Sequence, residues 1–287
     1  MLNLLRMELR TMFRSKGIYI TFTALLGVLL IALGTMKLVT TPSMKQEAAK
    51  HGMEFDADDE SDAQEFLADT QTDFVSNLLF NGGLMTVLMA IIGCIAVCED
   101  FDNGFVKNIF SCCTDKKAYV FSKLILLAVV SAAFLVLLSL CTFVLFRIFG
   151  FPNPIGDLPR LLLMFVIGWL GLISLSAQSI FFCMLTRNTI LSILLSIACG
   201  LGAFDGMLDL LTGQAGIHIA EFFPSYNVLM APYISGGSDT ANNSLLALML
   251  GGSMTVSAPA LSVLVSLAWT AIYTFLAAAI LKRKDIC

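Results

Sequence analysis

The sequence predicts an all-α integral membrane protein with six transmembrane helices and no soluble catalytic domain of its own. Composition is the first reason: 57% of the 287 residues are hydrophobic and only 13% are charged, about half the charged fraction of a soluble domain. The second reason is a series of long stretches without a charged side chain. A helix rises about 1.5 Å per residue, so about 20 such residues cross the hydrocarbon core of a bilayer.

Charged residues delimit the predicted spans, because a charge at membrane depth is costly. The last uncharged stretch, residues 241–281, is too long for one crossing, and Pro259 near its middle predicts a break. We therefore expect residues 212–258 to form an outer re-entrant region before the sixth span. The six predicted spans are residues 17–39, 75–97, 124–146, 161–185, 189–211 and 259–281.

The positions of lysine and arginine predict the orientation, because cytoplasmic segments carry an excess of both. With a cytoplasmic N-terminus, twelve of the 17 fall inside and five outside, so both termini are expected in the cytoplasm. The inside group is Arg6, Arg10, Arg14, Lys16, Lys107, Lys116, Lys117, Lys123, Arg187, Lys282, Arg283 and Lys284. The outside group is Lys37, Lys45, Lys50, Arg147 and Arg160.

Residues 1–16 predict an amphipathic helix that lies in the membrane interface. Its apolar stripe at helical spacing consists of Leu2, Leu5, Leu9, Met12 and Phe13, and arginines recur beside it at every fourth residue. Such a helix turns its basic side toward the lipid headgroups. A segment that only sets the orientation of the first span would explain the arginines equally well.

Residues 40–74 form a predicted outer loop that contains ten acidic residues and only two lysines. A charge run is commonly a solvated surface, and that interpretation suffices here. The alternative is that the loop concentrates cationic partners or peptides at the outer surface. The sequence leaves its role open.

Residues 98–123, between the second and third spans, contain a predicted short helix that is too polar to cross the membrane. Acidic residues come first, and Asn103-Gly104 then changes the direction of the chain. Phe105 and Ile109 give the helix that follows an apolar side. A cytoplasmic helix of this kind can dock a partner protein; a simple interfacial helix is the alternative.

The run from Glu99 to Ile109 resembles a pattern of ABC-2-type transporter permeases, in which acidic residues, a glycine and then Lys-Asn follow the second span. The Lys-Arg-Lys-Asp run at residues 282–285 is similar to the C-terminal ending of many of these permeases. Six spans, an N-terminal interfacial helix and re-entrant helices before the sixth span also resemble their type-2 ABC exporter fold. The similarity is greatest to the stand-alone permeases that export bacitracin, lantibiotics and peptide toxins.

The resemblance implies a subunit of the bacterial cytoplasmic membrane that works with a second permease chain, identical or sister, and with two copies of a separate ABC ATPase. ATP and Mg are then bound by that ATPase, and no cofactor is expected on this chain. By resemblance, the ATPase-coupling residues are Glu99, Asp100, Asn103, Gly104, Phe105, Lys107 and Asn108. Phe105 replaces a small Thr or Ser that is frequent after the glycine, which bears on partner selectivity.

Asp205 and Asp209 lie one helical turn apart toward the outer end of the fifth span. Ionisable residues at membrane depth commonly face a bundle interior or water, but these two could equally lie at the outer interface. Aromatic residues follow in the re-entrant region. The candidate path or gate residues are Asp205, Asp209, Phe222, Phe223 and Tyr226.

The absence of several sequence motifs excludes some functional classes. The chain has no Gly-Lys dipeptide and therefore no P-loop, and it has no C-x-x-C spacing, so a zinc site is not expected. No basic tail or aromatic-basic patch is present to bind nucleic acid. We expect a permease that exports amphipathic peptides or lipophilic antimicrobials in contact with membrane lipid. A non-transporting sensor or immunity protein that binds peptides is the main alternative, and a membrane enzyme using Asp205 and Asp209 is the second.

Overall fold

The computed structural model describes residues 6–10, 12, 16–41, 64, 66–102, 104, 116–213, 219–235 and 259–283, and every regular element among them is a helix. The predicted all-α membrane class is thereby confirmed. Among the described residues, five helices are long and apolar enough to cross a membrane: α2 (Lys16–Thr40), α6 (Leu84–Asp102), α8 (Lys116–Phe149), α9 (Leu158–Thr186) and α15 (Pro259–Arg283). The count becomes six if the pair α10 (Thr189–Gly200) and α11 (Ala203–Gly213), bent by 44°, forms one span.

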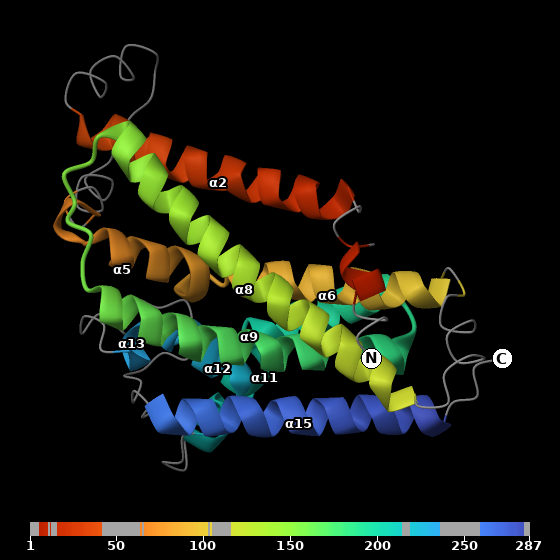
Figure 1. Ribbon diagram of the computed structural model, residues 1–287. Coiled ribbons are helices and arrows are strands. Elements are labelled where there is room, and N and C mark those ends of the chain that lie inside the picture. Colours follow the sequence, from red (N-terminus) through yellow and green to blue (C-terminus); the bar gives the residue numbers. More distant parts are fainter. Residues whose placement is uncertain are drawn as a thin grey trace.

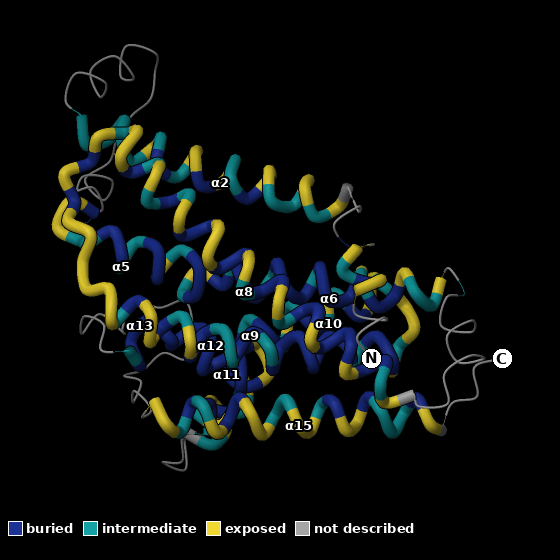
Figure 2. Tube along the Cα trace, viewed as in Figure 1, coloured by how far each residue is buried: buried dark blue, intermediate teal, exposed yellow. Residues whose placement is uncertain are grey.

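Helix α9 lies at the centre of the bundle. It packs against α6, α8, α10 and α15, whereas α2 lies at one edge and α15 at the opposite side (Figure 1). The burial of each helix agrees with its position in the bundle. Helices α6 and α9 are mostly buried, and α2 and α15 show exposed residues along much of their length (Figure 2). The start of α2, the end of α6, the start of α8 and the end of α15 gather at one end of the bundle (Figure 1).

The second predicted span differs from the single helix over residues 75–97. The chain instead forms α5 (Gln71–Ser76), a π-helical turn η1 (Asn77–Asn81) and then α6. The break follows from Asn81-Gly82-Gly83, because Gly83 adopts φ +67°, a conformation that side chains with a Cβ rarely adopt. A prediction based on the absence of charged residues does not detect this break, because glycine carries no charge.

The fifth predicted span, residues 189–211, is likewise divided. Gly202 has φ +83° and separates α10 from α11. The described part of the outer region then forms a 3₁₀ turn η2 (Ala220–Phe222) and two short helices, α12 (Pro224–Leu229) and α13 (Ala231–Ile234). All residues of α12 and α13 are buried. At membrane depth such short, irregular backbone is tolerated only where protein shelters it.

A phenylalanine cluster lies between α5 and α8, at the end of α8 that is remote from Lys116. The ring of Phe66 lies 5.0 Å from that of Phe151 and 5.7 Å from that of Phe146, measured between centroids. Asn153 donates to the carbonyl of Phe66 (2.6 Å), and Gln71 donates to the carbonyl of Asn153 (2.8 Å). These contacts attach the last part of the predicted acidic loop to the α8–α9 connection.

Candidate functional site

The two ends of the predicted coupling segment are joined by an ion pair. The Lys123 ammonium near the start of α8 lies 2.7 Å from Oδ2 of Asp100 near the end of α6, and the Tyr119 hydroxyl donates to the same oxygen (2.8 Å). Of the predicted coupling residues, Glu99, Asp100 and Gly104 are described. Asn103, Phe105, Lys107 and Asn108 lie outside the described residues.

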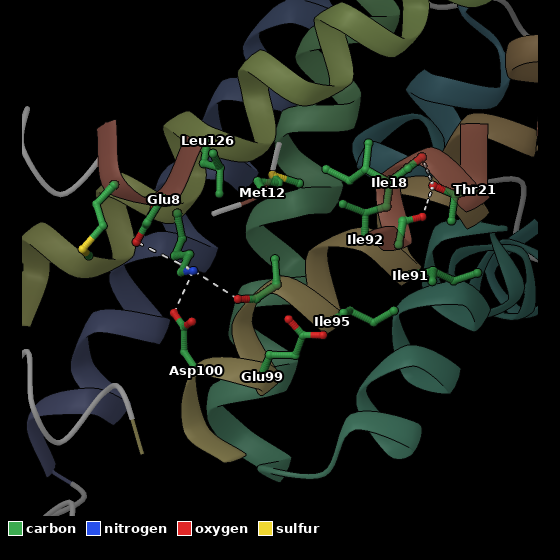
Figure 3. Close-up of a pocket in the computed structure, with 14 residues that line it drawn as sticks. Glu8, Met12, Ile18, Thr21, Ile91, Ile92, Ile95, Glu99, Asp100 and Leu126 are labelled. Atoms are coloured by element: carbon green, nitrogen blue, oxygen red, sulfur yellow. Dashed lines mark hydrogen bonds and ion pairs between the residues drawn. The ribbon is translucent and has the colours of Figure 1, made fainter. Parts of the chain in front are cut away.

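The N-terminal helix joins this ion pair through Glu8. Oε1 of Glu8 lies 3.7 Å from the Lys123 ammonium and accepts a hydrogen bond from the Ser122 hydroxyl (3.3 Å). The ammonium also donates to the carbonyl of Ala96 (3.1 Å). The carboxylates of Glu8 and Asp100, both labelled in Figure 3, are thus the two acidic partners of the Lys123 ammonium. We call Glu8, Asp100, Tyr119, Ser122 and Lys123 the junction.

The junction is largely removed from solvent. The side chains of Glu8 and Lys123 are 3% and 5% exposed, and that of Asp100 is 18% exposed. Burial raises the pKa of Glu8, and the neighbouring Lys123 ammonium opposes that rise. Removing one partner of a buried ion pair is strongly destabilising because it leaves the other charge unpaired. The junction therefore connects the N-terminal helix, α6 and α8.

Asp100 of the junction lies in the motif predicted to couple to an ATPase, whereas Glu8 and Lys123 were not predicted as site residues. A signal for Glu8 was present. It is the only acidic residue before Glu47, and helical spacing places it beside Leu5 and Met12, on the apolar side of a basic helix. An acidic residue in that position needs a partner when the helix packs. Lys123 was predicted only as the limit of a span.

Asp205 and Asp209 lie inside the bundle, only 1% and 7% exposed. Oδ2 of Asp205 accepts from the Ser225 hydroxyl (2.7 Å). Oδ1 of Asp209 accepts from the backbone N–H groups of Ile219 (2.7 Å) and Ala220 (3.1 Å). These bonds attach the chain after α11 to the helix, so both carboxylates hold the outer region in place.

The three aromatic residues predicted with these acids have different surroundings. Phe222 is 53% exposed and Tyr226 is 1% exposed. Phe223 stacks on Trp269 of α15 with ring centroids 5.7 Å apart, and the Trp269 indole donates to the carbonyl of Phe222 (2.6 Å). The aromatic contacts thus connect the re-entrant region to α15. Their role in a path or gate stays a prediction.

Within the described ranges, no group of three or more His, Cys, Asp or Glu side chains is placed to hold a metal ion. Two buried thiols, those of Cys94 and Cys183, lie on α6 and α9. Cys183 Sγ lies 3.7 Å from the carbonyl oxygen of Cys94, and Cys94 Sγ lies 3.4 Å from the Ser196 hydroxyl. They act as small side chains in a helix contact.

Long apolar helices, a junction at one end of the bundle and sheltered short helices near the other end define a multi-pass membrane protein. Residues 4–202 match a family described as "ABC-2 family transporter protein". Because the match covers more than half of the chain, the protein belongs to this family of membrane transport components. No curated protein and no solved structure matches the chain significantly. The matched range includes the junction but ends before Asp205.

Proposed function

We propose that this chain is the permease subunit of an ATP-driven exporter of the bacterial cytoplasmic membrane, with both termini in the cytoplasm. Its cargo would be amphipathic peptides or lipophilic antimicrobials. A separate ABC ATPase, in two copies, would dock on residues 98–123 and supply the energy. A second permease chain would complete the path. The observation that carries the proposal is the junction at the two ends of residues 98–123.

The junction suits a coupling role because it joins three elements at one place. The contact between Asp100 and Lys123 connects α6 to α8, and Glu8 adds the N-terminal helix. Packed helices move as rigid elements when a ligand or partner displaces them. A displacement of residues 98–123 by an ATPase would therefore reach all three elements together.

The cargo class is proposed from the chemistry of the chain. The span helices are rich in Leu, Phe and Met, so a path between them would suit apolar or amphipathic molecules. The excess of acidic residues in segment 40–74 would favour cationic peptides at the outer surface.

The proposal is tested by detergent pull-down of tagged protein from its native host, followed by an ATPase assay of the eluate. Gly104 has φ +66°, and the space around its Cα is open. Gly104→Trp should therefore change the coupling segment without disturbing the packed bundle. Gly150 has the same φ of +66° and equally open surroundings beyond the opposite end of α8, so Gly150→Trp is the matched control.

We expect an ATP-binding subunit to co-purify with the wild type and with Gly150→Trp, and to be lost with Gly104→Trp. Equal ATPase recovery from both variants would contradict docking at residues 98–123. A wild-type protein that purifies without ATPase activity would favour the non-transporting sensor or immunity function. In that case, resistance should persist when the ATPase encoded by the host is catalytically inactive.

A further inference from the structure

A cavity of about 310 Å³ lies beside the junction. Its walls come from the N-terminal helix, the first turns of α2, the last turns of α6 and the start of α8. Most of the lining is apolar, including Ile18, Ile92, Ile95 and Leu126. Figure 3 shows these side chains together with the carboxylates of Glu8, Glu99 and Asp100. The cavity therefore combines an apolar wall with charged groups.

The charged groups of this cavity are predominantly negative. Its described lining includes three carboxylates, Glu8, Glu99 and Asp100, and one ammonium, that of Lys123. Lys123 makes its shortest contacts with Asp100 (2.7 Å) and the carbonyl of Ala96 (3.1 Å), whereas it lies 3.7 Å from Glu8. The formal charge of these four groups is therefore −2.

Glu8 has an oxygen that the junction does not use. Its Oε1 contacts Ser122 and Lys123, but Oε2 is buried and has no hydrogen-bond partner among the described residues. The whole residue is only 5% exposed. A buried carboxylate oxygen without a partner is costly, and a cationic N–H donor would form the strongest class of hydrogen bond with it.

The size of the cavity excludes a single bridging water as its natural occupant. At roughly 30 Å³ per molecule in the liquid, about ten waters would fill such a volume. Against the isoleucine and leucine side chains these waters would find few polar partners. Displacing poorly ordered water by an apolar group is favourable, so the apolar wall is suited to an aliphatic chain.

We propose that this cavity binds an amphiphile with a primary ammonium head. The head would donate to Oε2 of Glu8 and contact the Glu99 carboxylate. The aliphatic chain would lie against Ile18, Ile92 and Leu126. Such a molecule could be the amine headgroup and adjoining chain of a membrane lipid, or a single-chain cationic amphiphile. The binding does not depend on an ATPase partner, so it can be tested separately from the proposed export function.

The test uses the full chain in phosphatidylcholine nanodiscs and a twelve-carbon primary alkylamine that carries a photoreactive diazirine in its chain. The matched probe is the alcohol of the same length. Labelling of peptides containing Ile18 and Ile92 is measured by mass spectrometry. It is divided by the labelling of Phe275 on α15, which is 73% exposed and reports partition of each probe into the bilayer.

We expect the normalised labelling of the cavity to be about tenfold higher for the amine than for the alcohol, as a charge-assisted hydrogen bond implies. Glu8→Gln should remove most of this preference. Glu99→Gln, at an exposed position on the cavity wall, should lower it independently even if Glu8→Gln perturbs folding. Asp157→Asn changes an exposed acid near the opposite end of the bundle and should have no effect.

Equal labelling by amine and alcohol would overturn the proposal, as would a preference that neither glutamate substitution reduces. Nanodiscs containing phosphatidylethanolamine distinguish the two sources of the amine. Reduced probe labelling in them identifies the lipid headgroup as an occupant, and unchanged labelling limits the site to single-chain amines. Both of these results support an ammonium site.

Discussion

At the scale of single residues, Lys123 shows how the structure accommodates a buried charge. A lysine is almost never fully buried without a partner, yet the side chain of Lys123 is only 5% exposed. Two carboxylates and a carbonyl surround its ammonium, and its position over the Tyr119 ring, 5.7 Å from the centroid, adds a cation–π contact. The charge is accommodated because each neighbouring helix contributes a group of opposite polarity.

Replacing Lys123 with methionine should therefore destabilise the protein strongly. The substitution keeps much of the apolar stem but leaves Glu8 and Asp100 facing each other without the ammonium. Breaking a buried ion pair in this way costs roughly 3–5 kcal/mol. The measurement is the free energy of unfolding in detergent. Lys282→Met removes an exposed lysine from the end of α15 and should change stability little; similar losses for both variants would contradict a structural role of the junction.

Asp205 and Asp209, near the other end of the bundle, are also buried acidic groups that are compensated by polar partners. Each carboxylate is buried, and each accepts hydrogen bonds from the chain that follows α11. Burying a polar group without a partner is costly, so a buried carboxylate must be hydrogen-bonded. Their place in the structure therefore explains why charges are tolerated there, before any role in a transport path is considered.

At the scale of elements, α9 depends on glycine for its close contacts. A Cβ atom at Gly168 would overlap the ring of Phe80 in η1, and one at Gly171 would overlap the side chain of Val228 in α12. Phe80 and Val228 are fully buried, so either side chain would have to move within the packed interior to make room. Small residues at helix contacts let neighbouring segments approach closely within a membrane.

Gly168→Leu should accordingly lower stability, although leucine favours a helix by roughly 1 kcal/mol over glycine. Overpacking a filled core costs typically 1–3 kcal/mol, and the whole leucine side chain would have to displace Phe80. Thermal unfolding in detergent measures the effect. At Gly34 of α2, where no atom lies within 4 Å of a Cβ, the same substitution should be neutral or stabilising. A stable Gly168→Leu variant would show that η1 can move away from α9.

At the scale of the whole molecule, the gathering of helix ends defines two different sides. The start of α2, the end of α6, the start of α8 and the end of α15 share one end (Figure 1). The junction and the cavity beside it lie there, and the phenylalanine cluster lies near the other end. The lysine and arginine distribution predicts that the junction side faces the cytoplasm, where a soluble ATPase could reach it.

We therefore expect a green fluorescent protein fused after Cys287 to be fluorescent and an alkaline phosphatase fused there to be inactive, because the phosphatase requires the outer compartment. A phosphatase inserted within the predicted outer loop, residues 40–74, should be active. The reverse pattern at both positions would invert the topology. It would also place residues 98–123 beyond the reach of a cytoplasmic ATPase.

The sequence by itself determined the class of the protein. Whether a stretch such as residues 124–146 can cross a bilayer depends on its own length and charge. This ability can therefore be predicted from that segment of the sequence alone. The divisions at Gly83 and Gly202 were also marked in the sequence, but charge-free length alone does not detect them. The motif that begins at Glu99 also predicts where an ATPase would dock, and this stays a prediction.

Only the tertiary structure decided which residues form the junction and the cavity. Ser122 and Glu8 are 114 positions apart in sequence, and no local pattern relates them. Their contact depends on the packing of the N-terminal helix against α6 and α8, which is the sum of many weak contacts along whole helices. A membrane-spanning helix can be recognised from its own apolar sequence, because lipid surrounds it. A site between such helices depends on which side chains the packing of the helices brings into contact.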